Sequence, residues 1–439
     1  MDASSRGRDR ALRITGGSRL AGDVCVSGSK NAALPEMAAA LLTAEPLTLH
    51  NVPRVTDIAV MGEILSLLGG EARGQGTVVI DTGGVTDSDV PDHLGRRMRA
   101  TIVLLGALLA RFGHARVPRP GGDDIGARRV EQHLRGLRQM GAHVNETQTE
   151  IVATAERLRG DRIVFDLPTV TGTENILLAA VKAEGRTEIF NAAREPHVQD
   201  LCRLLMKMGA RIEGVGTERL IVDGTTELGG AEHTVIADYL EAGTYAIGVA
   251  AAGGEQRIEC TRPEDLQLLL LKLEQAGAHV QVGDEWFRVG REPATPLRPI
   301  DMSTWTFPGF PTDLQAQYMA LMTQADGESV ISEYVHENRF QHVRELAKMG
   351  AGITVEGRLH AIVHGPARLR GTELAIPDIR SGAALVIAAL CAEGDSLLRN
   401  SWHVERGYED MVGKLASVGA RIKTVRVDSE PPSGQHTYE

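Results

Sequence analysis

Residue types that mark nucleic-acid-binding proteins are scarce in this sequence. Aromatic residues make up only 4% of the 439 residues, and 47 Lys and Arg against 58 Asp and Glu leave a net charge of −11 at pH 7. This balance argues against binding of nucleic acid through a broad basic face and leaves room only for a local cationic pocket. Any anion that the protein binds must therefore occupy a focused site.

Long apolar runs and paired cysteine motifs are missing as well. The longest uninterrupted apolar run, Ala383 to Ala392, is far shorter than the ~20 residues that a membrane span needs. The first residues are polar and rich in arginine, unlike a secretion signal. We therefore expect a cytoplasmic protein without a membrane segment. All four cysteines are expected to be small buried hydrophobic residues in a reducing compartment, because they lack the spacing of a CxxC or zinc motif: Cys25, Cys202, Cys260 and Cys391.

The sequence does contain an internal repeat. Six times, an apolar helix end runs into a glycine and then into a β-type strand, as in LRQMGAHVN and LMKMGARIE. A helix that stops and reverses into a strand favours glycine there, because glycine tolerates the left-handed backbone conformation. Each unit is predicted to hold two helices and three or four strands. The first glycines of the six copies are Gly69, Gly141, Gly209, Gly277, Gly350 and Gly419.

The apolar segments between these turns predict the architecture. ILLAAV, YAIGVAAA and ALVIAALCA are apolar nearly all round, which is typical of helices that sheets enclose. Six units indicate two pseudo-symmetric lobes of three units, with a crossing between the lobes near Asp238. We therefore predict an α/β protein with helices inside each lobe and sheets outside.

Charged residues in glycine- and proline-rich contexts are the candidates for chemistry, because a rigid scaffold usually carries function on its loops. In the first half, Lys30 with Asn31 lies between a strand and an apolar helix, a junction that suits an anion. Arg99 directly precedes another apolar helix. Each cation could equally be an ordinary solvated side chain. The segment from Arg119 to His133 combines three glycines with adjacent carboxylates, which favours a mobile lid over a simple acidic turn.

The second half contains a matching set of charged residues. Asp313, in FPGFPTDLQAQ, stands where an N-cap is expected, so a purely structural role stays open. Arginines in similar loops follow at Arg339, Arg380 and Arg406. Two cationic faces that meet across a cleft predict a small substrate with several negative groups, and closure of the lobes once that substrate neutralises them.

Several motifs together resemble the enolpyruvyl transferases over nearly the whole chain, and most closely the branch that uses UDP-N-acetylglucosamine. They are SGSKNAALP, NVPRVTD, PGGDDIGAR, TENILLAA, NAAREP, PGFPTDLQAQ, ENRF and RGYE. The resemblance implies two inside-out α/β barrel lobes, each of three βαβαββ-type units. It places residues 29–236 in the first lobe and residues 1–28 with 237–439 in the second. It implies neither a metal nor an organic cofactor, and leaves the oligomeric state open.

The resemblance also implies a reaction. Phosphoenolpyruvate would donate its enolpyruvyl group to a hydroxyl of a uridine nucleotide, through a tetrahedral ketal that loses phosphate. Asp313 would be the base, Lys30, Arg128 and Arg406 would hold the phosphate, and Arg339 with Arg380 the carboxylate. Asp378 would support Lys30 and Arg406. The implied acceptor-binding residues are Asn31, Arg99, Arg128, Arg129, Val130, Glu131, Gln132, His133, Thr169, Val170, Thr171, Asp313, Val335 and His336.

Departures from the family pattern bear on both substrates. Asp123 stands where most members have a cysteine that takes up phosphoenolpyruvate and is alkylated by fosfomycin, so we predict insensitivity to that drug. A carboxylate acts as an acid at neutral pH only if its pKa is raised. On the acceptor side, the unusual residues are Arg129, Glu131, Gln132, Thr171, Tyr239 and His336.

These departures leave three hypotheses. The first is transfer to the 3-hydroxyl of UDP-N-acetylglucosamine, the opening step of peptidoglycan precursor synthesis. The second is a paralogue that transfers to UMP or another uridine nucleotide in nucleoside-antibiotic biosynthesis. The third is a non-catalytic nucleotide-sugar sensor, against which the retained charges argue.

Overall fold

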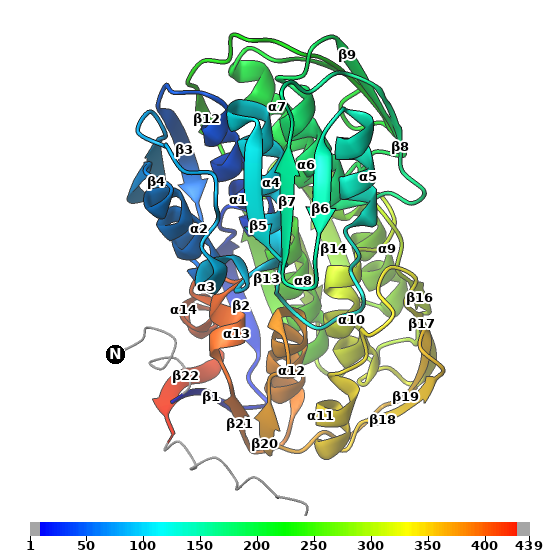
Figure 1. Ribbon diagram of the computed structural model, residues 1–439. Coiled ribbons are helices and arrows are strands. Elements are labelled where there is room, and N and C mark those ends of the chain that lie inside the picture. Colours follow the sequence, from blue (N-terminus) through cyan, green and yellow to red (C-terminus); the bar gives the residue numbers. More distant parts are fainter. Residues whose placement is uncertain (1–8, 428–439) are drawn as a thin grey trace, which may run out of the picture.

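The computed structural model describes residues 9–427, so both ends of the predicted second lobe, 1–8 and 428–439, lie outside it. Two separate hydrophobic cores organise this part of the chain. The first core contains buried residues from Ala32 to Val235. The second contains residues from Leu12 to Val26 together with residues from Tyr239 to Ile422. We call the parts around these cores the first lobe and the second lobe; Figure 1 shows the first lobe above the second.

Three sheets of three or four strands surround each core, as the repeat predicts. The sheets of the first lobe, in strand order, are β12 (Glu232–Thr234), β3 (Leu47–Val52) and β4 (Glu71–Asp81); β5 (His114–Pro118), β7 (Glu150–Thr154) and β6 (His143–Glu146); and β10 (Arg211–Glu213), β11 (Arg219–Asp223), β9 (Arg186–Phe190) and β8 (Arg162–Val164). Those of the second lobe are β14 (His279–Val282), β15 (Trp286–Arg291), β13 (Gly254–Glu259) and β2 (Leu20–Cys25); β16 (Met302–Ser303), β17 (Gly327–Ser332), β19 (His360–Gly365) and β18 (Gly352–Glu356); and β20 (Glu373–Ala375), β21 (Asp395–Arg399), β1 (Arg10–Thr15) and β22 (Arg421–Arg426).

Central helices fill the lobes and outer helices cover them. The central helices are α1 (Lys30–Ala39), α4 (Leu104–Phe112) and α6 (Val170–Ala180) in the first lobe, and α8 (Tyr239–Ala252), α10 (Gln315–Met322) and α12 (Ile379–Cys391) in the second. The others are α2 (Thr56–Leu67), α3 (Asp92–Gly95), α5 (Glu131–Gln139), α7 (Pro196–Lys207), α9 (Gln267–Ala276), α11 (Val343–Lys348), α13 (Trp402–Glu405) and α14 (Met411–Ser417), with 3₁₀ turns η1 (Ala40–Leu42), η2 (Arg99–Val103), η3 (Pro263–Leu266) and η4 (Thr312–Leu314). Helices α8 and α12 are buried along almost their whole length, which confirms the prediction of enclosed helices.

The repeated glycines mark the turn from an outer helix into a strand. All six have a φ between 95° and 108°, in the left-handed region that side chains disfavour. The prediction that each copy needs glycine at this turn is therefore confirmed. The turn is also the reason why the repeat is visible in the sequence.

The chain crosses between the lobes twice, and the two crossing segments lie side by side. The amide of Ser29 donates to the carbonyl of Ile236 at 2.7 Å, and the amide of Asp238 donates to the carbonyl of Ser27 at 2.9 Å. Gly28 is required at this place, because a Cβ there would lie 1.7 Å from the carbonyl oxygen of Asn51. The crossing thus joins the start of α1 to the start of α8.

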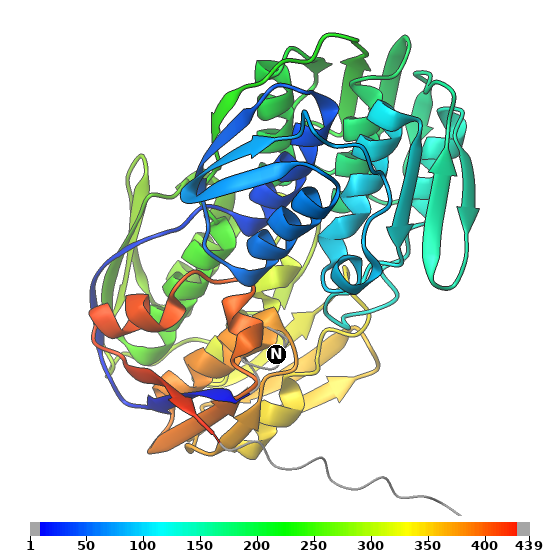
Figure 2. The same ribbon diagram turned by 60° about the vertical axis from the view of Figure 1, so that its left-hand side comes forward.

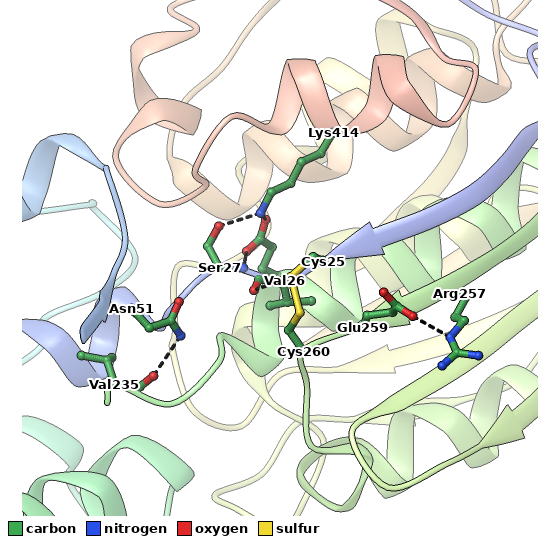
Figure 3. The surroundings of a disulfide bond; sticks show 10 residues. Cys25, Val26, Ser27, Asn51, Val235, Arg257, Glu259, Cys260 and Lys414 are labelled. Atoms are coloured by element: carbon green, nitrogen blue, oxygen red, sulfur yellow. Dashed lines mark hydrogen bonds and ion pairs between the residues drawn. A yellow bond between two sulfur atoms is a disulfide. The ribbon is translucent and has the colours of Figure 1, made fainter. Parts of the chain in front are cut away.

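The cysteine prediction is wrong for two of the four residues. Cys25, at the end of β2, and Cys260, just after β13, form a disulfide with their Cα atoms 5.5 Å apart (Figure 3). Strands β2 and β13 are parallel neighbours, with Cys25 opposite Glu259, so the fold brings together two cysteines 235 residues apart. Cys202 is buried, as predicted, and Cys391 is half-buried. Within residues 9–427, no helix is both long and apolar enough to cross a bilayer.

Candidate active site

A cavity of about 380 Å³ lies between the two lobes, and both contribute charged residues to its wall. We call it the interlobe cavity. Most of the residues singled out in the sequence line it. They are Lys30, Asn31, Arg99, Asp123, Arg128, Arg129, Thr169, Val170, Thr171, Asp313, Val335, His336, Arg339, Arg380 and Arg406.

Two central helices begin at the interlobe cavity, each with a cation in its first turn. Lys30 is the first residue of α1, which the Ser29 side chain caps by accepting the amide of Ala32. Arg380 is in the first turn of α12, which Asp378 caps by accepting the amides of Arg380 and Ser381 at 3.0 Å each. Amides at a helix N-terminus attract anions, so each helix adds to the charge of its cation.

Asp57, which the sequence analysis did not assign to the site, joins two of the predicted phosphate-binding cations. Its Oδ2 lies 3.4 Å from Nζ of Lys30, and its Oδ1 accepts a 3.0 Å hydrogen bond from Nε of Arg406. All three side chains are buried. Asp57 occupies the first turn of α2 and belongs to NVPRVTD, so the motif match was the available signal. It therefore fixes Lys30 and Arg406 with respect to each other.

Asp313 forms a second ion-pair cluster across the cavity. Its Oδ1 accepts a hydrogen bond from Nη2 of Arg339 at 2.6 Å, and its Oδ2 lies 3.0 Å from Nη2 of Arg380. Burial alone would raise the pKa of the Asp313 carboxyl group, but attraction to Arg380 and Arg339 outweighs burial and holds the pKa well below its usual value. The side chain is therefore ionised in this structure, with both predicted carboxylate-binding arginines as its partners.

Asp123 and its loop lie over the cavity in a closed position. Oδ1 of Asp123 accepts a 2.8 Å hydrogen bond from Nη1 of Arg406. Burial acts to raise the pKa of Asp123, but the charges of Arg406 and Lys30 lower it, so the residue is a carboxylate here and not an acid. The following residues contact the second lobe: Ala127 donates its amide to Glu337 at 2.8 Å, and Asn338 donates to the carbonyl of Asp124 at 3.2 Å.

The cavity also has a polar wall, of which the sequence analysis named only Tyr239. Glu174, Glu195, His197 and Tyr239 line the cavity and are largely buried. Burial, with a smaller effect of Glu195, raises the pKa of Glu174 to about 8. The motifs TENILLAA and NAAREP contain the two glutamates and were the only signal for them. Burial raises the pKa of Glu195 as well, and this wall presents hydrogen-bonding groups to the same cavity that Arg99 and Arg128 line.

Five predicted site residues do not line the interlobe cavity: Val130, Glu131, Gln132, His133 and Asp378. Helix α5 begins at Glu131, and Gln132 bonds with the amide of Asp166 and the carbonyl of Leu167. His133 is buried, with Nδ1 3.2 Å from Nδ2 of Asn175, and burial lowers its pKa to about 3. The carboxylate of Asp378 caps α12, and Asp57 takes the position between Lys30 and Arg406 that we expected of Asp378.

Two lobes of three inside-out units around a cationic cavity are the fold and site expected for the enolpyruvyl transferases, and comparisons with known proteins agree. The EPSP synthase (3-phosphoshikimate 1-carboxyvinyltransferase) family matches residues 14–415. The chain belongs to this family and is an enolpyruvyl (1-carboxyvinyl) transferase.

Individual relatives show which members of the family this chain is similar to. The UDP-N-acetylglucosamine 1-carboxyvinyltransferase of Solibacter usitatus (strain Ellin6076) is 49% identical over 418 residues, which cover 94% of this chain and 99% of that protein. Among solved structures, the enolpyruvyl transferase NikO from Streptomyces tendae superposes with a TM-score of 0.84 at 28% identity, covering 96% of this chain and all of NikO. An EPSP synthase from Acinetobacter baumannii has a TM-score of 0.71 at 18% identity over 95% of this chain and all of its own, which supports the fold alone.

Proposed function

We propose that this enzyme transfers the enolpyruvyl group of phosphoenolpyruvate to the 3-hydroxyl of UDP-N-acetylglucosamine and releases phosphate. The choice of acceptor rests on the 49% identity, over nearly the full length, to a protein named UDP-N-acetylglucosamine 1-carboxyvinyltransferase. The cavity supports the donor, because its two cation groups match the two anionic ends of phosphoenolpyruvate: Lys30 with Arg406 for the phosphate, and Arg339 with Arg380 for the carboxylate.

In the proposed reaction, the acceptor hydroxyl adds to C2 of phosphoenolpyruvate while a proton is delivered to C3. The resulting tetrahedral ketal loses a proton from C3 and expels phosphate, which restores the enol double bond on the sugar. Asp313 is proposed to take the hydroxyl proton. Its ion pairs make it a weak base in this structure, but a substrate carboxylate at Arg339 and Arg380 would compete for those partners and raise its pKa.

Asp123 is proposed to respond to the phosphate in the same way. Arg406 holds it ionised, and a phosphate dianion placed between Lys30 and Arg406 would compete for Arg406 and repel the carboxylate. A raised pKa would then allow Asp123 to carry a proton close to the reacting atoms. Substrate binding would thus prepare both carboxylates for proton transfer.

The test is phosphate release from phosphoenolpyruvate with UDP-N-acetylglucosamine or UMP as the acceptor. We expect turnover with the sugar nucleotide, and a loss of about 100-fold or more in kcat for Asp313→Asn, since a positioned base typically contributes that much. Asp223→Asn, which removes a surface ion pair with Arg186, is the matched control and should keep full activity. Turnover with UMP alone would replace the proposed acceptor, and no turnover with either acceptor would favour the sensor hypothesis.

A further inference from the structure

Three titratable side chains meet in the first lobe, outside the interlobe cavity. Glu36 comes from α1, Asp200 from α7 and His233 from β12. Nε2 of His233 lies 3.2 Å from Oδ1 of Asp200 and 3.7 Å from Oε1 of Glu36, and one ligand atom of each residue lies within 4.8 Å of the other two. Relative exposure is 0% for Glu36, 2% for Asp200 and 5% for His233, so water does not solvate them.

Four polar atoms of this cluster, on Glu36 and His233, have no assigned hydrogen bond within the described chain, and the electrostatic attraction within the cluster comes from Asp200. Within residues 9–427, neither oxygen of Glu36 and neither ring nitrogen of His233 forms a hydrogen bond with acceptable geometry. Asp200 is better satisfied, because its Oδ2 accepts the amide of Ile236 at 3.0 Å. The nearest guanidinium in an ion pair, Nη1 of Arg203, is 3.8 Å from Asp200 on a partly exposed side chain. A buried carboxyl group with two free oxygens is costly unless a further group binds it.

We propose that Glu36, Asp200 and His233 together bind one divalent transition-metal ion. Zinc is the ion used below to test this site. Imidazole and carboxylate are suitable ligands, and metal–ligand distances of about 2.0–2.2 Å in a tetrahedral site place the ligand atoms about 3.3–3.6 Å apart. The 3.2 Å and 3.7 Å separations of Asp200 and Glu36 from Nε2 of His233 bracket that range. Two carboxylates also balance the charge of a divalent cation in this buried place.

The position of the site gives the ion a structural role. Glu36 is on the helix that begins with Lys30, and Asp200 holds Ile236, whose carbonyl accepts the amide of Ser29 at the crossing between the lobes. A bound ion would join α1, α7 and β12, and α1 is the helix that begins with Lys30 at the interlobe cavity. It would not touch the substrates, so it requires no change in the proposed reaction.

The competing explanation is a proton shared between Glu36 and Asp200. The two explanations differ for Glu36→Gln, because a glutamine mimics a protonated glutamate but is a poor metal ligand. The full chain should be unfolded in a chelator, refolded without reductant so that the disulfide stays intact, and titrated with Zn²⁺. Bound zinc is measured by elemental analysis and stability by the melting temperature.

We expect the wild-type protein to bind about one zinc per chain and to melt at a higher temperature when it is loaded. Glu36→Gln should fold, bind zinc at least 10-fold more weakly, and lose the zinc-dependent rise. Glu232→Gln, next to His233 but paired with His50 on the surface, should behave as the wild type. Equal zinc affinity in Glu36→Gln and wild type, or no zinc in either, would overturn the proposal in favour of the shared proton.

Discussion

Nη1 of Arg406 donates a 2.8 Å hydrogen bond to Oδ1 of Asp123, joining residues 283 positions apart. Asp123 lies on the glycine-rich loop of the first lobe, and Arg406 follows α13 of the second. The same guanidinium also binds Asp57. The loop therefore closes onto Arg406, a cation of the proposed phosphate site. A phosphate bound at that site would change the charge that the loop contacts.

Replacement of Asp123 by cysteine should make the enzyme sensitive to fosfomycin. The wild-type carboxylate, ionised and bound to Arg406, is a poor nucleophile toward the epoxide of the drug. A thiol at this position, beside Lys30 and Arg406, would have a lowered pKa and react as a thiolate. We expect time-dependent, irreversible loss of activity in Asp123→Cys only, checked by residual turnover after removal of the drug and by the mass of the protein.

The control for this experiment is Cys202→Ser in the Asp123→Cys background, because Cys202 is a buried free thiol of the first lobe. Inactivation should persist in that double variant. Rapid inactivation of the wild-type enzyme by fosfomycin would contradict the prediction.

Asp57→Asn should damage the use of phosphoenolpyruvate specifically. Without the carboxylate, Lys30 and Arg406 lose their common partner and repel each other. We expect kcat/KM for phosphoenolpyruvate to fall about 10- to 100-fold, as small displacements of binding groups do. Steady-state kinetics measure this loss, while the dissociation constant of the acceptor alone should stay within about twofold.

Asp92→Asn is the matched control, since Asp92 also pairs with two arginines, Arg96 and Arg116, but at the surface. It should leave both constants unchanged. If Asp57→Asn weakened acceptor binding as strongly as it weakened the use of phosphoenolpyruvate, Asp57 would be a general stability residue and not a positioning residue.

Gly126→Ala should hinder closure of the loop. Gly126 has a φ of 138°, and a Cβ there would lie 2.4 Å from Oε2 of Glu337, the residue that receives the Ala127 amide. We expect kcat/KM to fall about 10-fold with little change in melting temperature, because the strain acts on an exposed loop. Removing the obstructing side chain with Glu337→Ala in the same chain should restore part of the loss.

Gly185→Ala controls for backbone strain alone in this comparison. Gly185 has a φ of 89°, but no atom beyond its own chain neighbours lies within 4 Å of a Cβ placed there. Activity in this variant should match the wild type. A loss equal to that of Gly126→Ala would show that the effect does not come from loop docking.

Glu174→Gln should remove a pH dependence of stability. The pKa of Glu174 is about 8 in the folded protein and about 4.3 in an unfolded chain. Between these values, the folded state keeps a proton that the unfolded state has lost, so the free energy of unfolding falls as pH rises through this range. We expect Glu174→Gln to be more stable than wild type by up to about 4 kcal/mol at pH 8, and equally stable near pH 4.

Denaturant titrations of both proteins across this range measure the difference. Burial lowers the pKa of His197 and of His336 to about 4, and these residues destabilise both proteins alike below their unfolded pKa of about 6.5. Comparison at each pH therefore isolates Glu174. A difference that is constant with pH would contradict the raised pKa.

Features set by local backbone chemistry could be predicted from the sequence. The six turn glycines reflect a left-handed φ that depends only on the helix end, so they gave the correct number of units. Lys30 stands directly at the start of α1, and its place between a strand and an apolar helix is a local pattern, whereas Arg380, expected on a loop, lies in the first turn of α12. The turn glycines and Lys30 are recognisable without knowledge of their distant neighbours.

Features that depend on distant pairing were missed or misassigned. Asp57 looks like an ordinary acid in the first turn of a helix until the fold brings it to Arg406, 349 residues away. Cys25 and Cys260 likewise pair only because β2 lies beside β13. Asp378 was assigned a role beside Lys30, although a carboxylate directly before an apolar helix is itself the signal of an N-cap.

The place of β1 affects how the chain completes its fold during synthesis. This strand, near the N-terminus, lies between β21 and β22, which come from the last part of the described chain (Figure 2). Both of its edges therefore stay unpaired on the ribosome until β21 and β22 have emerged, whereas the core of the first lobe can form earlier from continuous sequence. The first strand of the described chain is among the last to find its partners, and a chain that stops short of β21 leaves it as a free edge open to association with other chains.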